Sequence, residues 1–112
     1  LHPSTRRHYA PAFPDHDSEL SLAGWTKKVS GAPVIAVGSV GLETQFRSER
    51  RGQVISPAPV DRLVEQFDAD EFDIVAIGRA LLADPAWVNR LRANELDSFA
   101  GYDPQTALAA LA

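Results

Sequence analysis

Two glycine-containing turns hold the residues of this sequence that are best suited to chemistry. The apolar run 34–37 leads into Gly38-Ser39-Val40, and the apolar run 72–77 leads into Gly78-Arg79. Because glycine has no Cβ, consecutive backbone N–H groups at such a turn can approach one anion closely. The Arg79 guanidinium would add a fork of donors that suits phosphate oxygens. The two turns therefore predict a phosphate-binding module, although a plain turn glycine and a surface arginine would produce the same pattern.

The elements that must position these turns alternate between helices and short apolar strands. The pattern predicts a helix over 19–30 with an N-cap at Asp15, Asp17 or Ser18, and strands near 34–37 and 73–77. Helices are predicted over 60–67, over 80–82, after Asp84-Pro85 and from Asp103-Pro104 onward, whereas 1–18 and 47–59 read as a loop and a surface excursion. Alternation of this kind favours an α/β fold with a parallel sheet, strands buried on both faces, and Gly38 and Gly78 at the same end.

Apolar side chains define the buried faces that these helices are expected to have. The predicted faces consist of Val60, Leu63, Val64 and Phe67 in one helix and of Trp87, Val88 and Leu91 in another. Only two convincing strands are present, and both of their outer edges would be unpaired. We therefore expect further strands from an N-terminal part or from another chain, and we expect self-association.

Composition excludes several classes of function. The 112 residues suffice for one small domain, and the net charge of -4 disfavours nucleic acid and anionic membranes as partners. The sequence has no cysteine, which excludes disulfides, thiolate metal sites and cysteine nucleophiles. No apolar run is long enough to span a bilayer and no secretory pattern opens the chain, so a cytoplasmic protein is expected. The start at Leu1 suggests a piece of a longer protein.

Four segments of the sequence resemble a known enzyme family. They are Ser4-Thr5-Arg6-Arg7, the stretch 23–28 (AGWTKK), the stretch 37–41 (VGSVG) and, most specifically, the stretch 71–85 (EFDIVAIGRALLADP). Together they resemble the last two β/α units of the Old Yellow Enzyme family, the NADH:flavin oxidoreductases. The resemblance implies that residues 1–112 form a single incomplete domain, the C-terminal portion of an FMN-binding (β/α)8 TIM barrel.

The resemblance also implies a cofactor and a division of labour. The backbone N–H groups of Gly38, Ser39 and Val40 would bind the FMN phosphate, and Gly78 with Arg79 would complete the clamp. NAD(P)H would reduce FMN, which would then reduce an activated alkene. No catalytic residue is assigned in this chain, since the groups that contact the flavin ring and the substrate would come from earlier strands, and the isolated chain is expected to be inactive.

Two alternatives stay open beside this interpretation. One is a non-catalytic phosphate- or nucleotide-binding fragment. The other is a different phosphate-binding barrel, such as an isomerase or aldolase, which is disfavoured because neither strand ends in a lysine or carboxylate.

The remaining chemically capable residues favour structural roles. His2, His8 and His16 have spacings that fit no metal site. Tyr9 could reach a flavin but is expected to pack on a neighbouring helix. Trp25 and Trp87 are expected in the core. Asp73 lies at the entry of a strand, the end that barrels use for stability.

Overall fold

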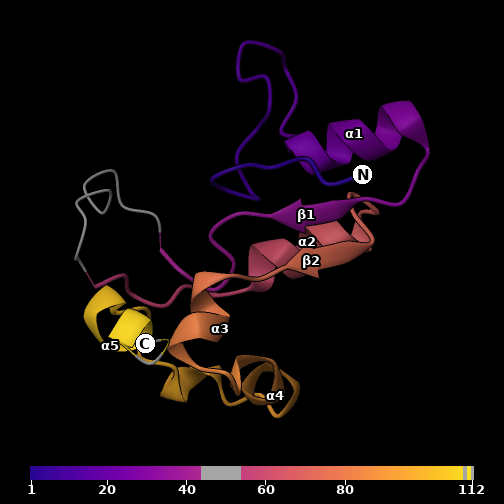
Figure 1. The fold of residues 1–112 in the computed structure, drawn as a ribbon. Coiled ribbons are helices and arrows are strands. Elements are labelled where there is room, and N and C mark those ends of the chain that lie inside the picture. Colours follow the sequence, from indigo (N-terminus) through magenta and orange to yellow (C-terminus); the bar gives the residue numbers. More distant parts are fainter. Residues whose placement is uncertain (44–53, 110, 112) are drawn as a thin grey trace. The chain divides into compact units, whose positions relative to one another are not determined.

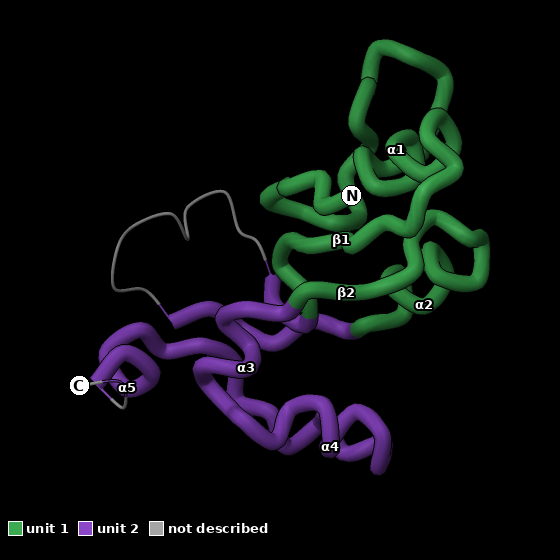
Figure 2. The backbone as a smooth tube through the Cα atoms, turned by 45° about the vertical axis from the view of Figure 1, so that its right-hand side comes forward, with its two compact units in different colours: residues 1–40, 60–76 green, residues 41–59, 77–112 purple. Residues whose placement is uncertain are grey.

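The computed structural model describes residues 1–43, 54–109 and 111, in an order of elements close to the expected one (Figure 1). The elements are α1 (Leu22–Ser30), β1 (Ile35–Val37), α2 (Asp61–Asp68), β2 (Ile74–Ala76), α3 (Arg79–Ala83), α4 (Trp87–Arg92), the 3-10 helix η1 (Leu96–Ser98) and α5 (Pro104–Ala109). They divide into two compact units (Figure 2). Unit 1 contains residues 1–40 and 60–76, and unit 2 contains residues 41–59 and 77–112. None of the described helices is long and apolar enough to cross a membrane.

Unit 1 is built on the parallel pairing of β1 with β2. Ile35 lies opposite Ile74 and Val37 lies opposite Ala76. The two strands therefore end at the same edge, with Gly38 directly after β1 and Gly78 two residues after β2 along the chain. This confirms the predicted pairing and direction of the strands.

The helix α1 starts later than predicted and stops where predicted. Ser21 is its N-cap, in place of the earlier candidates, because the Ser21 Oγ accepts a hydrogen bond from the Gly24 N–H at 3.1 Å. Gly31 ends the helix in the left-handed conformation with φ of 65°, and its N–H donates to the Lys27 carbonyl.

Burial in unit 1 departs from the predicted pattern. The core takes Val34 and Ala36, but Ile74 in β2 is 58% exposed, so the expectation of strands buried on both faces is wrong for β2. In α2, Leu63 is buried, but Val64 is 50% and Phe67 is 53% exposed, so the predicted buried face is wrong for these two residues. A sheet of two strands is too narrow to cover a wide apolar stripe. The other buried residue of α2, besides Leu63, is the polar Gln66.

The helices of unit 2 are short and contact one another. Trp87 in α4 is 1% exposed, which confirms its predicted place in the core. The helix α3 contacts α4 and α5. Val88 and Leu91 are partly exposed, so the predicted buried face of α4 is wrong apart from Trp87. Asp84 closes the α3–α4 turn by accepting from the Ala86 N–H at 2.9 Å, and α4 begins only at Trp87.

Residues 47–53 of the predicted surface excursion 47–59 lie outside the described residues. The part that follows is not wholly a surface loop, because Ile55 is buried. Its N–H and carbonyl pair with the carbonyl and N–H of Tyr102 at 2.7 and 2.8 Å.

The assignment as the last two β/α units of a (β/α)8 barrel is wrong for this structure. Strands of a barrel pair with a neighbour on each side, whereas the sheet in the described residues has two strands, each with the other as its only sheet partner. The segment after β2 forms helices that pack mainly on each other within unit 2. The described residues thus form five α-helices, one 3-10 helix and a two-stranded parallel sheet.

Candidate functional site

The turn after β1 is held in place by the loop that precedes α1. The His8 N–H donates to the Gly38 carbonyl at 3.0 Å, and the Thr5 hydroxyl donates to the Val37 carbonyl at 3.0 Å. In the other direction, the Ser39 hydroxyl donates to the Arg6 carbonyl at 2.8 Å. Three hydrogen bonds over four residues of the loop fix the turn at the end of the strand.

Gly38 is required at this turn by both its backbone and its neighbours. Its φ is 123°, a conformation that side-chain-bearing residues rarely adopt. A Cβ placed there would lie 2.6 Å from the Thr5 carbonyl oxygen and 2.8 Å from backbone atoms of Arg6 and Arg7. Ser39 follows with φ of 53°, so two successive residues have positive φ. The glycine therefore permits the loop to approach the strand end closely.

The same turn has backbone donors available for a ligand. Across residues 1–43 and 54–109, no acceptor is bonded to the N–H of Ser39 or of Val40. Val40 is buried and Ser39 is half-buried, so an unbonded N–H here is costly unless a ligand or water accepts from it. Successive N–H groups in a turn of this kind can bind an anionic oxygen.

The turn after β2 has none of these constraints. Gly78 has φ of -106°, and a Cβ there would have no atom within 4 Å. Its carbonyl accepts from the Leu81 and Leu82 N–H groups in the first turn of α3. Arg79 is exposed.

The structure thus places the five predicted site residues in two groups. Gly38, Ser39 and Val40 belong to unit 1, and Gly78 and Arg79 belong to unit 2. Each group is contiguous, and a single clamp made from both remains a prediction.

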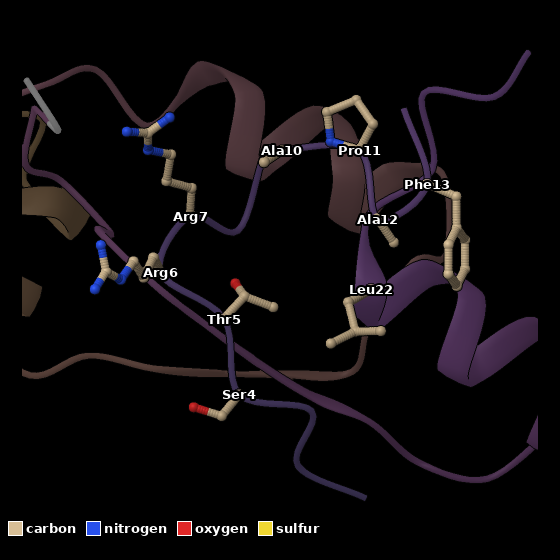
Figure 3. Close-up of a pocket in the computed structure, with 9 residues that line it drawn as sticks. All are labelled: Ser4, Thr5, Arg6, Arg7, Ala10, Pro11, Ala12, Phe13 and Leu22. Carbon is tan, nitrogen blue, oxygen red and sulfur yellow. The ribbon is translucent and has the colours of Figure 1, made fainter. Parts of the chain in front are cut away.

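A pocket that sequence reasoning missed is lined by the same loop. It has a volume of about 430 Å³ and is lined by residues 4–7, residues 10–13 and Leu22 (Figure 3). All of these belong to unit 1. In the sequence, Arg6 and Arg7 are followed by the apolar residues 10–13. This pattern indicates a pocket only when the fold of the loop is known.

His8 is the buried ionisable group nearest to the turn. Its Nδ1 lies 2.6 Å from the Gln66 Oε1, and the Gln66 Nε2 donates to the His8 carbonyl at 2.8 Å. Because the Gln66 amide is oriented by that second bond, Nδ1 must carry the proton. Burial lowers the pKa of His8, with the nearby Arg62 acting in the same direction and the Gln66 hydrogen bond and Glu71 opposing it.

Asp73 has the structural role that its position predicts. Its carboxylate accepts from the Val34 N–H at 2.8 Å and from the Lys27 ammonium at 2.9 Å. The hydrogen bond from Lys27, followed by that from Val34, lowers the pKa of Asp73. The contact ties the C-terminal part of α1 to the start of β2.

The aromatic residues of the loop contact one another. Tyr9 packs edge-to-face on His8, with ring centroids 5.2 Å apart, so this contact lies within the loop and not on a neighbouring helix. Trp25 is half-buried, with Phe13 against its edge and the Lys28 ammonium over its ring. In the described part of the chain, no group of three or more His, Asp or Glu residues is placed to hold a metal ion.

Comparison with models of known protein families gives no match to this chain. A search of curated proteins gives no match either.

Proposed function

We propose that the turn Gly38-Ser39-Val40 binds the phosphate of FMN, and that the protein serves an FMN-dependent NAD(P)H oxidoreductase of the ene-reductase type. One observation supports phosphate binding above the others. The N–H groups of Ser39 and Val40 have no acceptor in the described residues, although the turn that holds them is fixed by three hydrogen bonds to the loop 5–8. A fixed turn with unused donors is suited to a ligand that supplies the acceptor.

The resemblance of stretches 37–41 and 71–85 to NADH:flavin oxidoreductases supports FMN as the ligand whose phosphate binds at this turn. When bound, FMN supplies the hydride transfer from NAD(P)H to an activated alkene, which is chemistry that a protein without cysteine leaves to a cofactor. The residues of this chain bind and orient the phosphate end. We expect the chain alone to bind FMN without turnover, and we expect a cytoplasmic location.

Flavin titration tests this function directly. FMN and riboflavin differ by the phosphate alone, so a phosphate site predicts that FMN binds at least about tenfold more tightly, as expected for charge-assisted hydrogen bonds. Flavin fluorescence measures both affinities. Equal affinities for the two flavins would contradict the proposal.

A pair of glycine variants links the preference to the turn. Gly38→Ala should abolish the preference for FMN, because its Cβ would meet the backbone of residues 5–7 and displace the turn. Gly31→Ala is the matched control, since Gly31 also has a positive φ of 65° but no atom within 4 Å of a Cβ. Circular dichroism of both variants shows whether each is folded.

The same titration distinguishes FMN binding from the alternative function, general binding of phosphates or nucleotides. AMP carries a phosphate but no flavin ring. If AMP displaces FMN at similar concentrations, the site recognises phosphate alone, and the flavin part of the proposal fails while the phosphate part holds.

A further inference from the structure

The pocket beside the turn combines an apolar wall with an arginine, and we propose that it binds a small organic molecule with an apolar body and a single carboxylate. The proposal goes beyond FMN phosphate binding and does not depend on it. The pocket volume of about 430 Å³ lies within the range of small-molecule sites. Its lining comes from one face of the loop 4–13 and from the first residue of α1.

The apolar wall is already formed in the structure. The Ala12 N–H donates to the Leu20 carbonyl at 3.0 Å, and Pro11 forms a bridge with Ser21, so residues 10–13 are tied to the start of α1. The Phe13 ring stands edge-on to Trp25, with centroids 5.8 Å apart. Phe13 nevertheless remains 48% exposed, which leaves apolar surface for a ligand.

Arg7 provides the cation. Arg7 is half-buried, and no carboxylate among residues 1–43 and 54–109 forms an ion pair with its guanidinium. Arg6 also lines the pocket but has an interaction of its own. In Figure 3 both arginine side chains lie on the side of the pocket opposite Phe13. A ligand with its charged end toward Arg7 would therefore place its apolar end on the wall.

The backbone under Arg7 is fixed, so the position of its side chain is restricted. His8, the next residue, donates its N–H to the Gly38 carbonyl, and Arg6, the previous residue, accepts from the Ser39 hydroxyl. The Thr5 hydroxyl donates its hydrogen to the Val37 carbonyl, so it has no donor left for a ligand. We therefore assign Arg7 to the anionic end of the ligand; in Figure 3 its guanidinium extends away from Phe13.

The chemistry of the pocket favours a carboxylate over a phosphate. A planar guanidinium binds a carboxylate through two parallel hydrogen bonds, and one cation neutralises one anion. A phosphate dianion would keep an uncompensated charge beside Phe13 and Leu22, which is unfavourable. The ligand class is therefore a monocarboxylic acid with an aryl or alkyl group.

The test uses 3-phenylpropanoate and its neutral counterpart 3-phenylpropanol as probes of the full chain. Both are titrated without FMN into 15N-labelled protein, and amide shifts report the affinity and the place of binding. We expect shifts at residues 4–13, and affinity for the acid at least about tenfold above that for the alcohol, which corresponds to one charge-assisted interaction.

Two variants and a control assign the interaction. Arg7→Gln should remove the preference for the acid, whereas Arg92→Gln, which removes an exposed arginine in unit 2, should keep it. Phe13→Ala should weaken both probes about equally, because it removes part of the wall. Equal affinity for acid and alcohol, an unchanged preference in Arg7→Gln, or shifts that leave the pocket lining, residues 4–13 and Leu22, unaffected would each overturn the proposal. None of these results alters the FMN-to-riboflavin ratio, so the two proposals fail separately.

Discussion

The two turns that follow β1 and β2 start from the same sequence pattern and have opposite structural properties. Both follow an apolar run and begin with glycine. At Gly38 the backbone has a positive φ, and the loop 5–8 is packed and hydrogen-bonded against it. At Gly78 the φ is negative and a Cβ would meet no atom within 4 Å.

The difference separates two reasons for a glycine. Gly38 is needed by the fold of unit 1, because only glycine permits the close approach of the loop. Nothing in the described part of unit 2 requires glycine at 78, so whatever favours it there lies outside the packing that the structure shows. The same strand-then-glycine pattern can therefore mark a glycine that the fold requires and one that it does not require.

Exchange of each glycine for alanine gives the largest expected contrast. Gly38→Ala should destabilise the protein by about 2 to 5 kcal/mol, from left-handed strain together with overpacking against backbone atoms. Gly78→Ala should change the free energy of unfolding by less than about 1 kcal/mol, as is usual for an open position. Urea unfolding followed by circular dichroism measures both.

A comparable loss in the two variants would break the comparison. It would show that Gly78 is packed in a way that the described residues do not include. A small loss in Gly38→Ala alone would mean that the loop 5–8 moves away at little cost, and the turn would then be a poor candidate for a preformed site.

Arg79 tests whether the open turn serves a ligand. If it contacts the FMN phosphate, Arg79→Ala should weaken FMN binding by roughly 1.5 to 3 kcal/mol, and lysine should restore only part of this because it lacks the planar fork. Riboflavin affinity should not change. Stability should not change either, since Arg79 is exposed.

The matched control is Arg92→Ala, which removes the same charge from another exposed position of unit 2. Equal effects of the two arginine variants on FMN binding would indicate a general electrostatic contribution. Unchanged FMN affinity in Arg79→Ala would remove Arg79 from the predicted site and leave Gly38-Ser39-Val40 as its only part.

Local signals in the sequence predicted the elements well because they depend on neighbouring residues. Apolar runs between Pro33 and Gly38 and between Phe72 and Gly78 defined the two strands, and Gly31 marked the end of α1. The parallel direction followed from the helix between the strands. These features need only backbone preferences and short-range patterns.

Burial was predicted less well because it depends on what lies across the sheet. Phe67 and Ile74 are apolar and would be covered by further strands and helices in a larger α/β fold, but the described residues provide a sheet of two strands. Gln66 gives the opposite case. It is polar and yet fully buried, since it bonds His8, a residue 58 positions earlier in the chain.

The candidate site shows the same limit. The glycine turn was found from the strand-then-glycine pattern, but the loop that fixes it was assigned no role, and the pocket that this loop lines was missed. The loop is fixed by contacts with residues about 30 positions later, such as the bond from Thr5 to Val37. The pocket depends on the contacts of Pro11 and Ala12 with Ser21 and Leu20. Sequence spacing alone does not encode such contacts.

The smallest expected effect concerns pH and the His8 segment that holds the Gly38 turn. Burial lowers the pKa of His8 below its ordinary value of 6.5, so the folded protein resists protonation of the His8 Nε2 while the unfolded chain does not. Stability should therefore be full above pH 6.5 and should decline as the pH falls from 6.5 toward the lowered pKa, with a slope of at most about 1.4 kcal/mol per pH unit for one proton. The hydrogen bond from Nδ1 to Gln66 persists in both protonation states. The decline therefore comes from the cost of burying a charged imidazole and from its repulsion by Arg62.

Urea unfolding between pH 5 and 7 measures this decline in stability. A His8→Gln variant, which cannot titrate in this range, gives the contribution of all other groups, which is subtracted. If the slopes of wild type and variant coincide, His8 does not resist protonation, and its segment does not make the Gly38 turn more sensitive to pH than the Gly78 turn.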